Sequence, residues 1–261
     1  MSHPVPGAVM LVLAATCSLA SARAHSQSAQ DARNWPQHSL TRPRPAVIDP
    51  APASSATRPP SDAIVLFDGR DLSRWEKADD EKPGAAAWKV AHGYMEVVGG
   101  AGNIRTKQRF GDIQLHIEWS APAPPHGESQ ERGNSGVFLM GMYEVQILDS
   151  YQNETYADGQ AASVFGQYPP LVNASRPPGQ WQSFDIVWHR PQFDNAGALV
   201  RPAFVTVLHN GVLVQDNVEL LGPTAHQRRP PYAAHADRLP FSLQDHGFPV
   251  RFRNVWVRPL E

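Results

Sequence analysis

The sequence is nearly free of cysteine, has little net charge and contains no apolar run long enough for a confident membrane span. Cys17 is the single cysteine, so a chain that loses its first residues owes no stability to disulfides. The formal net charge of -2 excludes a strong electrostatic attraction to nucleic acid or to an anionic membrane surface. Phosphate loops, dinucleotide fingerprints and zinc-finger spacings are also missing, so we expect no nucleic acid partner.

The apolar run of residues 8–22 predicts a secretory signal peptide spanning residues 1–24. Ala22-Arg23-Ala24 follows the run and is typical of cleavage after Ala24, although no Lys or Arg precedes it. A lipoprotein anchored through Cys17 is an alternative, but Ala14-Ala15-Thr16 matches the usual small-residue box poorly. We therefore expect a periplasmic or secreted protein with no membrane span in the mature chain.

Residues 25–61 predict a disordered linker. This stretch is rich in Ser, Ala, Gln and Pro, and prolines from Pro43 to Pro60 interrupt any helix or strand ladder. Few large apolar residues are present to offset the entropy lost on ordering. The folded domain is therefore expected to cover residues 62–261.

Short strands and frequent turn residues dominate the folded part. Residues 110–119 alternate clearly, with Ile113, Leu115, Ile117 and Trp119 on one face. Asn210-Gly211 is typical of a tight hairpin turn. No stretch predicts a long helix, so we expect an all-β domain of about 200 residues, a size that suits one jelly-roll sandwich of two antiparallel sheets.

Residues 134–149 stand out as the centre of the chain. They predict two adjacent strands joined tightly at Gly141-Met142. In the second strand, Tyr143, Val145 and Ile147 share one face, and Glu144 and Gln146 share the other. Because a buried carboxylate or amide is costly unless it is paired or used, this pattern predicts the floor of a polar cleft.

Several motifs follow one another in a fixed order from Asp62 to Leu260. They are Leu66-Phe67-Asp68-Gly69, Asn134-Ser135-Gly136, residues 143–149, Gly166-Gln167-Tyr168, Trp181, Asn210-Gly211, residues 243–247 and residues 250–256. In this order and spacing the chain resembles the bacterial 3-keto-disaccharide hydrolase family. The resemblance implies a concanavalin A-like lectin/glucanase jelly roll and export to the periplasm. It further implies cleavage of 3-keto-glucosides by eliminating the aglycone across C1–C2, hydration of the resulting keto-glucal, and involvement of a divalent metal.

A ketone at C3 makes the C2 proton acidic, so such an enzyme needs a base near C2 and an acid for the departing oxygen. Glu144 is our first choice as base or metal ligand, unless it is paired with Arg251 or Arg253 instead. His116 and His246 are further catalytic candidates, and Glu118 could join Glu144 in holding a metal. Which face of the strand carrying His116 and Glu118 points inward is not decided by the sequence.

Other polar and aromatic residues are candidates for substrate binding. Gln146 could hold a sugar hydroxyl, and Asp149 could reach the site only through a bulge or a strand end because its parity is opposite to that of Glu144. Trp181 could stack on a sugar ring, although in a small β-domain it is more often a core residue. The substrate-binding candidates are Asn134, Gln146, Asp149, Tyr168, Arg251 and Arg253.

Two other functions remain open from the sequence. An ordinary glycoside hydrolase would pair Glu144 with Glu118 or Asp149 across one groove. A carbohydrate-binding module without catalysis would use the same architecture, because a fold does not fix a function.

Overall fold

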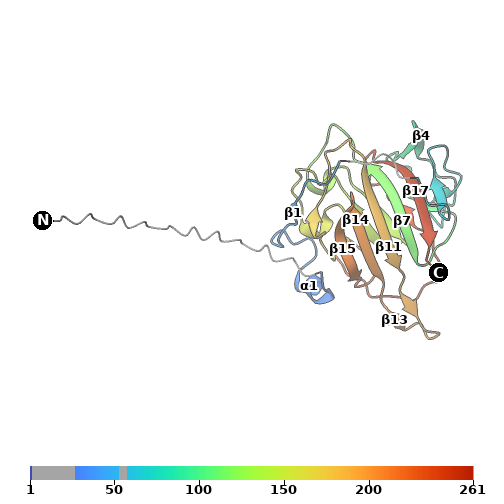
Figure 1. Ribbon diagram of the computed structural model, residues 1–261. Helices are drawn as coiled ribbons and strands as arrows, with labels where there is room; N and C mark the ends of the chain where they lie inside the picture. Colours follow the sequence, from blue (N-terminus) through green and yellow to red (C-terminus); the bar gives the residue numbers. More distant parts are fainter. Residues whose placement is uncertain (2–26, 53–57, 261) are drawn as a thin grey trace.

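The computed structural model describes Met1, residues 27–52 and residues 58–260 (Figure 1). The predicted signal peptide and its cleavage after Ala24 lie outside this part of the chain, as does Cys17. Among the described residues, no helix combines the length and apolarity needed to cross a membrane.

Two antiparallel sheets form the body of the domain. The large sheet has eight strands in the order β15-β14-β11-β7-β17-β5-β4, with β2 also paired to β17. Figure 1 shows β15, β14, β11, β7 and β17 side by side. Its strands are β2 (Ile64–Phe67), β4 (Lys89–Ala91), β5 (Tyr94–Glu96), β7 (Ile113–Ser120), β11 (Gln182–His189), β14 (Phe204–His209), β15 (Val212–Glu219) and β17 (Arg251–Pro259).

The small sheet has five strands in the order β3-β6-β16-β8-β9. These are β3 (Trp75–Lys77), β6 (Ile104–Thr106), β8 (Ser135–Leu139), β9 (Tyr143–Ile147) and β16 (Ser242–Leu243). The remaining elements are α1 (Ala29–Asn34), β1 (Ala46–Val47), β10 (Val172–Asn173), β12 (Gln192–Phe193), β13 (Leu199–Arg201) and the 3-10 turns η1 (Ser129–Glu131) and η2 (Ala157–Gly159). The predicted all-β jelly-roll sandwich is confirmed.

The alternation of the strands builds the core between the two sheets. In β7, Leu115, Ile117 and Trp119 are fully buried, so this face of the strand, which the sequence left open, is the one that points into the core. Tyr143 on β9 packs against Trp188 on β11 with ring centroids 5.1 Å apart, which joins the small sheet to the large one. Because alternate side chains point to opposite faces, the residues between these core positions point to the outer surfaces of the sandwich.

Both predicted tight hairpins are present. Met140 and Gly141 have positive φ angles of 53° and 72° in the turn between β8 and β9, so the turn begins one residue earlier than predicted. Asn210 and Gly211 have positive φ angles of 54° and 81° between β14 and β15, the geometry that a two-residue hairpin requires.

The described part of the predicted linker is ordered on the domain, contrary to expectation. We call residues 27–52 the N-terminal segment. It contains α1, and β1 pairs in parallel with β10. Its docking is largely polar: the buried Arg42 donates to the carbonyl of Gln167 at 3.0 Å, and within the segment it pairs with Asp31 at 3.1 Å. Apolar periodicity does not register such polar docking, so the sequence pattern misses it.

We predict that Arg42→Met lowers the free energy of unfolding by about 1–3 kcal/mol, because it leaves the carbonyl of Gln167 without its donor. Arg44→Met is the matched control, because Arg44 pairs with Glu154 at 3.2 Å where both side chains are well exposed. That control should change stability by less than about 0.5 kcal/mol. Chemical denaturation measures both, and equal losses in the two variants would contradict the docking described here.

Candidate functional site

The outer face of the small sheet carries a row of side chains that crosses all its strands. Strand register aligns Glu76, Arg105, Ser242, Phe138 and Glu144 across the sheet. A polar groove of about 390 Å³ lies over the β3, β6 and β16 end of this row, a volume suited to a small ligand. Its charged lining residues are Glu76, Asp80, Arg105, Lys107 and Arg109.

Glu144 lies at the β9 end of this row and is buried, with 6% of its surface exposed. Its carboxyl group lies across Gly136 on β8, where any side chain would collide with it. Among the described residues, no group donates a hydrogen bond to the Glu144 carboxyl, and burial alone raises its pKa to about 8. A carboxyl group with such a pKa can take up and return a proton near neutral pH.

A second set of polar groups, the amides, accompanies Glu144. Gln146 shares its face of β9 and donates through Nε2 to Asn134 Oδ1 at 3.0 Å. Gln244 follows β16, and its backbone nitrogen donates to the carbonyl of Gly136. Its side-chain Oε1 is buried and has no hydrogen-bond partner in the described part of the protein. Such orphaned acceptors are rare, and this one is suited to a ligand hydroxyl.

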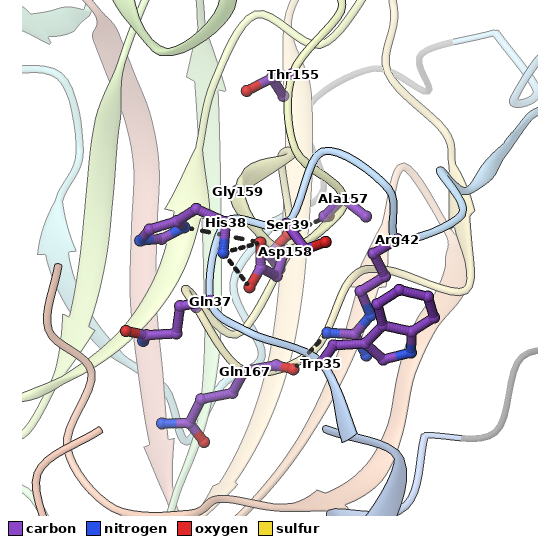
Figure 2. Close-up of polar contacts among 12 residues, drawn as sticks. Trp35, Gln37, His38, Ser39, Arg42, Thr155, Ala157, Asp158, Gly159 and Gln167 are labelled. Carbon is purple, nitrogen blue, oxygen red and sulfur yellow. Dashed lines mark hydrogen bonds and ion pairs between the residues drawn. The ribbon is translucent and has the colours of Figure 1, made fainter. Parts of the chain in front are cut away.

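The N-terminal segment and the loop before β10 border this site, which the sequence analysis missed. The backbone nitrogen of His38 donates to both carboxylate oxygens of Asp158, at 3.2 and 3.1 Å (Figure 2). The His38 ring packs on Tyr156 and Phe165 with centroids 4.2 and 5.0 Å apart. Phe165 in turn donates its backbone N–H to the carbonyl of Glu144.

Tyr156 connects this cluster to Glu144 electrostatically. Burial raises the pKa of the Tyr156 hydroxyl above its ordinary value, and the nearby charges of Asp158 and Glu144 raise it further. Both ring nitrogens of His38 are buried and lack hydrogen-bond partners among the described residues. Because His38 lies in a Pro-rich stretch without hydrophobic periodicity, no pattern in the sequence points to it.

A second polar cluster lies on the outer face of the large sheet, and we call it the His116 cleft. Its lining includes His116, Glu118, Trp181, Ser183, Asp185 and Arg253, and its volume is about 280 Å³. His116 Nδ1 lies 2.7 Å from Asp185 Oδ1, and Arg253 Nε donates to Glu118 Oε2 at 2.6 Å. Trp181 lines this cleft rather than the core, and the Arg253 guanidinium lies 4.1 Å from its ring centroid.

The ion pairs of the His116 cleft fix its charges. Burial would lower the pKa of His116, but hydrogen bonds to Asp185 and Glu118 outweigh it and raise that pKa to about 9. Burial would raise the pKa of Glu118, but bonds from His116, Asn254 and Arg253 lower it to about 2. His116 is therefore protonated and Glu118 ionised at neutral pH, which suits neither to act as a general base.

The structure divides the predicted site residues between two surfaces. His116 and Glu118 alternate with core residues of the large sheet, whereas Glu144 and Gln146 alternate with core residues of the small sheet. The two sets therefore lie on opposite outer surfaces of the sandwich. Glu118 and Glu144 are not brought together, so they cannot hold one metal ion between them.

The other predicted residues have partners of their own. Asp149 is buried and accepts from Arg132 Nε at 2.7 Å, and burial nevertheless keeps its pKa above the ordinary value. The buried Tyr168 donates its hydroxyl to the carbonyl of Glu219 at 2.6 Å, so it is not positioned to stack on a sugar. Arg251 pairs with Glu96 at 2.6 Å. The exposed His246 stacks on Phe248 in a loop.

The metal implied by the resemblance finds no ready-made site in the described residues. Nowhere in residues 27–52 and 58–260 do three or more His, Cys, Asp or Glu side chains converge as a metal site requires. The groups beside Glu144 are mainly amides. We therefore derive no step through a metal ion, and its involvement stays a prediction.

A sandwich with a polar groove, a buried carboxyl group and a set of amides on one face is suited to a polar ligand such as a sugar, and comparison with known proteins gives the class: a carbohydrate-acting protein of the hydrolase type. The chain belongs to the family described as the 3-keto-alpha-glucoside-1,2-lyase-like domain, whose profile matches residues 62–258. The family resemblance drawn from the sequence motifs is thereby confirmed. The N-terminal segment lies outside the matched residues.

Individual relatives agree with this assignment. The chain is 22% identical to a 3-keto-disaccharide hydrolase of Bacteroides thetaiotaomicron, over 76% of this chain and 78% of that protein. It is 46% identical to a candidate glycosyl hydrolase of Parabacteroides distasonis, whose crystal structure matches with a TM-score of 0.75 over 84% of this chain and 93% of that one. A second Parabacteroides distasonis structure, 18% identical with a TM-score of 0.55 over 76% and 94% of the two chains, shares the fold.

We predict that Gly136→Ala displaces the Glu144 carboxyl and lowers the free energy of unfolding by about 1–3 kcal/mol, because the new methyl group would overlap it. Gly84→Ala is the matched control, since a methyl group there meets no atom within 4 Å. Denaturation and turnover assays on both variants check this. A Gly136→Ala protein as stable and active as the control would show that Glu144 does not depend on the space above Gly136.

The raised pKa of Glu144 predicts a stability that falls with pH. Between its ordinary pKa of 4.5 and about 8, the unfolded state releases this proton while the folded state retains it. Rising pH therefore favours unfolding across this range, and the loss levels off above it. Relative to Glu144→Gln, we expect wild type to lose about 3–5 kcal/mol, at about 1.4 kcal/mol per pKa unit. Denaturation from pH 4 to 9 tests this, and parallel curves for the two proteins would contradict it.

Proposed function

We propose that this protein cleaves 3-keto-glucosides by removing the C2 proton, eliminating the aglycone and hydrating the resulting keto-glucal. One observation carries the proposal: Glu144 is buried, lacks a hydrogen-bond donor among the described residues and has a pKa of about 8. Such a carboxylate is basic enough to take a proton that a neighbouring ketone has made acidic. An ordinary, solvated glutamate would be a much weaker base.

The proposed reaction has two stages, an elimination and a hydration. Glu144 takes the C2 proton, and the electron pair forms an enolate with the C3 ketone. The enolate then expels the aglycone from C1, leaving a C1–C2 double bond, and the departing oxygen takes the proton that Glu144 removed from C2. Water then adds its hydroxyl at C1 and its proton, through Glu144, at C2, giving the free 3-keto sugar and the aglycone alcohol.

The neighbouring groups fit the remaining tasks. Gln146, Asn134 and Gln244 offer amide groups beside Glu144, of which the orphaned Gln244 Oε1 can accept from a sugar hydroxyl. The groove at the other end of the same row has room for an aglycone, and ion pairs of Arg105 with Glu76 at 2.8 Å and Asp80 at 2.6 Å hold its polar lining in place.

The two-carboxylate alternative has less support in the geometry. Glu118 lies on the opposite outer surface from Glu144, and Asp149 is engaged by Arg132 at 2.7 Å. A glycoside hydrolase needs two carboxyl groups facing one scissile bond, roughly 5–10 Å apart. The proposed export of the enzyme rests on residues 8–24 of the sequence alone.

A turnover assay in heavy water tests the proposal. We expect the enzyme to cleave a 3-keto-glucoside, but not its unoxidised parent, and to place solvent deuterium at C2 of the product. Direct hydrolysis would leave C2 unlabelled. Glu144→Gln should reduce the rate at least ~100-fold, because the amide cannot take the proton. Repeating the assay with a chelator tests whether a metal takes part.

Glu154→Gln is the matched control for that variant. The Glu154 side chain is 86% exposed, whereas Glu144 is buried. It should keep the wild-type rate. Cleavage of the parent glucoside at a similar rate, or an unlabelled product, would point to a two-carboxylate hydrolase. Binding of both sugars without turnover would favour a carbohydrate-binding module.

A further inference from the structure

The His116 cleft takes no part in the chemistry proposed for Glu144, yet it is built like a ligand site. Three neighbouring strands supply it: Ser183 on β11 aligns with Glu118 on β7, which aligns with Arg253 on β17. Two residues away on the same two strands, Asp185 aligns with His116. The cleft beside these groups has a volume of about 280 Å³.

The ion pairs hold the lining rigid before any ligand arrives. The Arg253 guanidinium is fixed by Glu118 on one side and by the ring of Trp181 on the other. Asp185 is fixed by His116 through one carboxylate oxygen, at 2.7 Å. A ligand that binds such preorganised groups loses less free energy to side-chain ordering.

The same groups keep unused hydrogen-bonding capacity. Within the described part of the chain, the terminal nitrogens of Arg253, the second oxygen of Asp185 and the hydroxyl of Ser183 make no hydrogen bond. The side chains of Arg253 and Asp185 remain 31% and 37% exposed. The cleft therefore offers donors and an acceptor at once. A simple anion would leave the acceptor unmatched, whereas neighbouring sugar hydroxyls donate and accept together.

We infer that the His116 cleft binds an uncharged pyranose ring, as a sugar site separate from the catalytic face. The hydroxyls of the ring bond to Asp185, Arg253 and Ser183, and Trp181 lines the same cleft as an apolar wall. A site on the opposite surface from Glu144 would keep the enzyme bound to a glycan while the reaction takes place at Glu144. The inference does not depend on the elimination chemistry.

Calorimetric titration with methyl α- and β-glucosides tests it, because these unoxidised sugars are not substrates in the proposed reaction. Arg253→Met and Asp185→Asn should each weaken binding at least about tenfold, since each removes a charged hydrogen-bonding partner. Arg251→Met is the matched control. Arg251 lies on the same strand, pairs with a glutamate and stacks on Tyr94, but lies outside the cleft. It should bind like wild type.

Ser183→Ala is a second variant that should leave the fold intact. The Ser183 hydroxyl has no hydrogen-bond partner in the described structure, and its loss breaks no ion pair. It should weaken binding by a few fold with unchanged circular dichroism. Absence of binding by wild type, or equal binding by Arg253→Met and Arg251→Met, would overturn the inference and leave the cluster as an ion network that ties three strands. Tighter binding of glucuronate than of the methyl glucosides would overturn the inference that the ligand is uncharged. Glu144→Gln should lose turnover while retaining this binding, which separates the two proposals.

Discussion

Tyr143 on β9 packs on Trp188 of β11, and this contact between the sheets determines which way the neighbouring side chains point. Once Tyr143, Val145 and Ile147 face the core, Glu144 and Gln146 must face away from it. The same rule on β7 sends His116 and Glu118 to the other outer surface. The separation of the Glu144 face from the His116 cleft thus follows from the packing of one hydrophobic core.

Burial then gives the two polar clusters different chemistry. Glu144 is buried without a charged partner, so its neutral form is favoured and its pKa rises to about 8. Glu118 is also buried, but Arg253, Asn254 and His116 stabilise its charge, so its pKa falls to about 2. Two glutamates that look equivalent in the sequence therefore differ in protonation: Glu144 titrates near neutral pH, whereas Glu118 stays ionised.

The N-terminal segment adds side chains to the surroundings of Glu144 from outside the residues that match the family, which are 62–258. His38 reaches Tyr156 and Phe165 beside Glu144, and Asp158 fixes its backbone. Polar bonds to buried carbonyls hold this segment, including that of Arg42 to Gln167.

The sequence by itself determined the all-β sandwich, the hairpin at Asn210-Gly211, the family, and the opposite faces of Tyr143 and Glu144. These features rest on period-two alternation, turn chemistry and short-range motifs, which are local properties of the chain. Only the tertiary structure decided that Glu144 lacks a charged partner and that Trp181 lines a cleft. It also decided that His116 lies opposite Glu144 and that His38 joins the site. Those facts depend on which distant strands and loops meet, and no local pattern records such long-range packing.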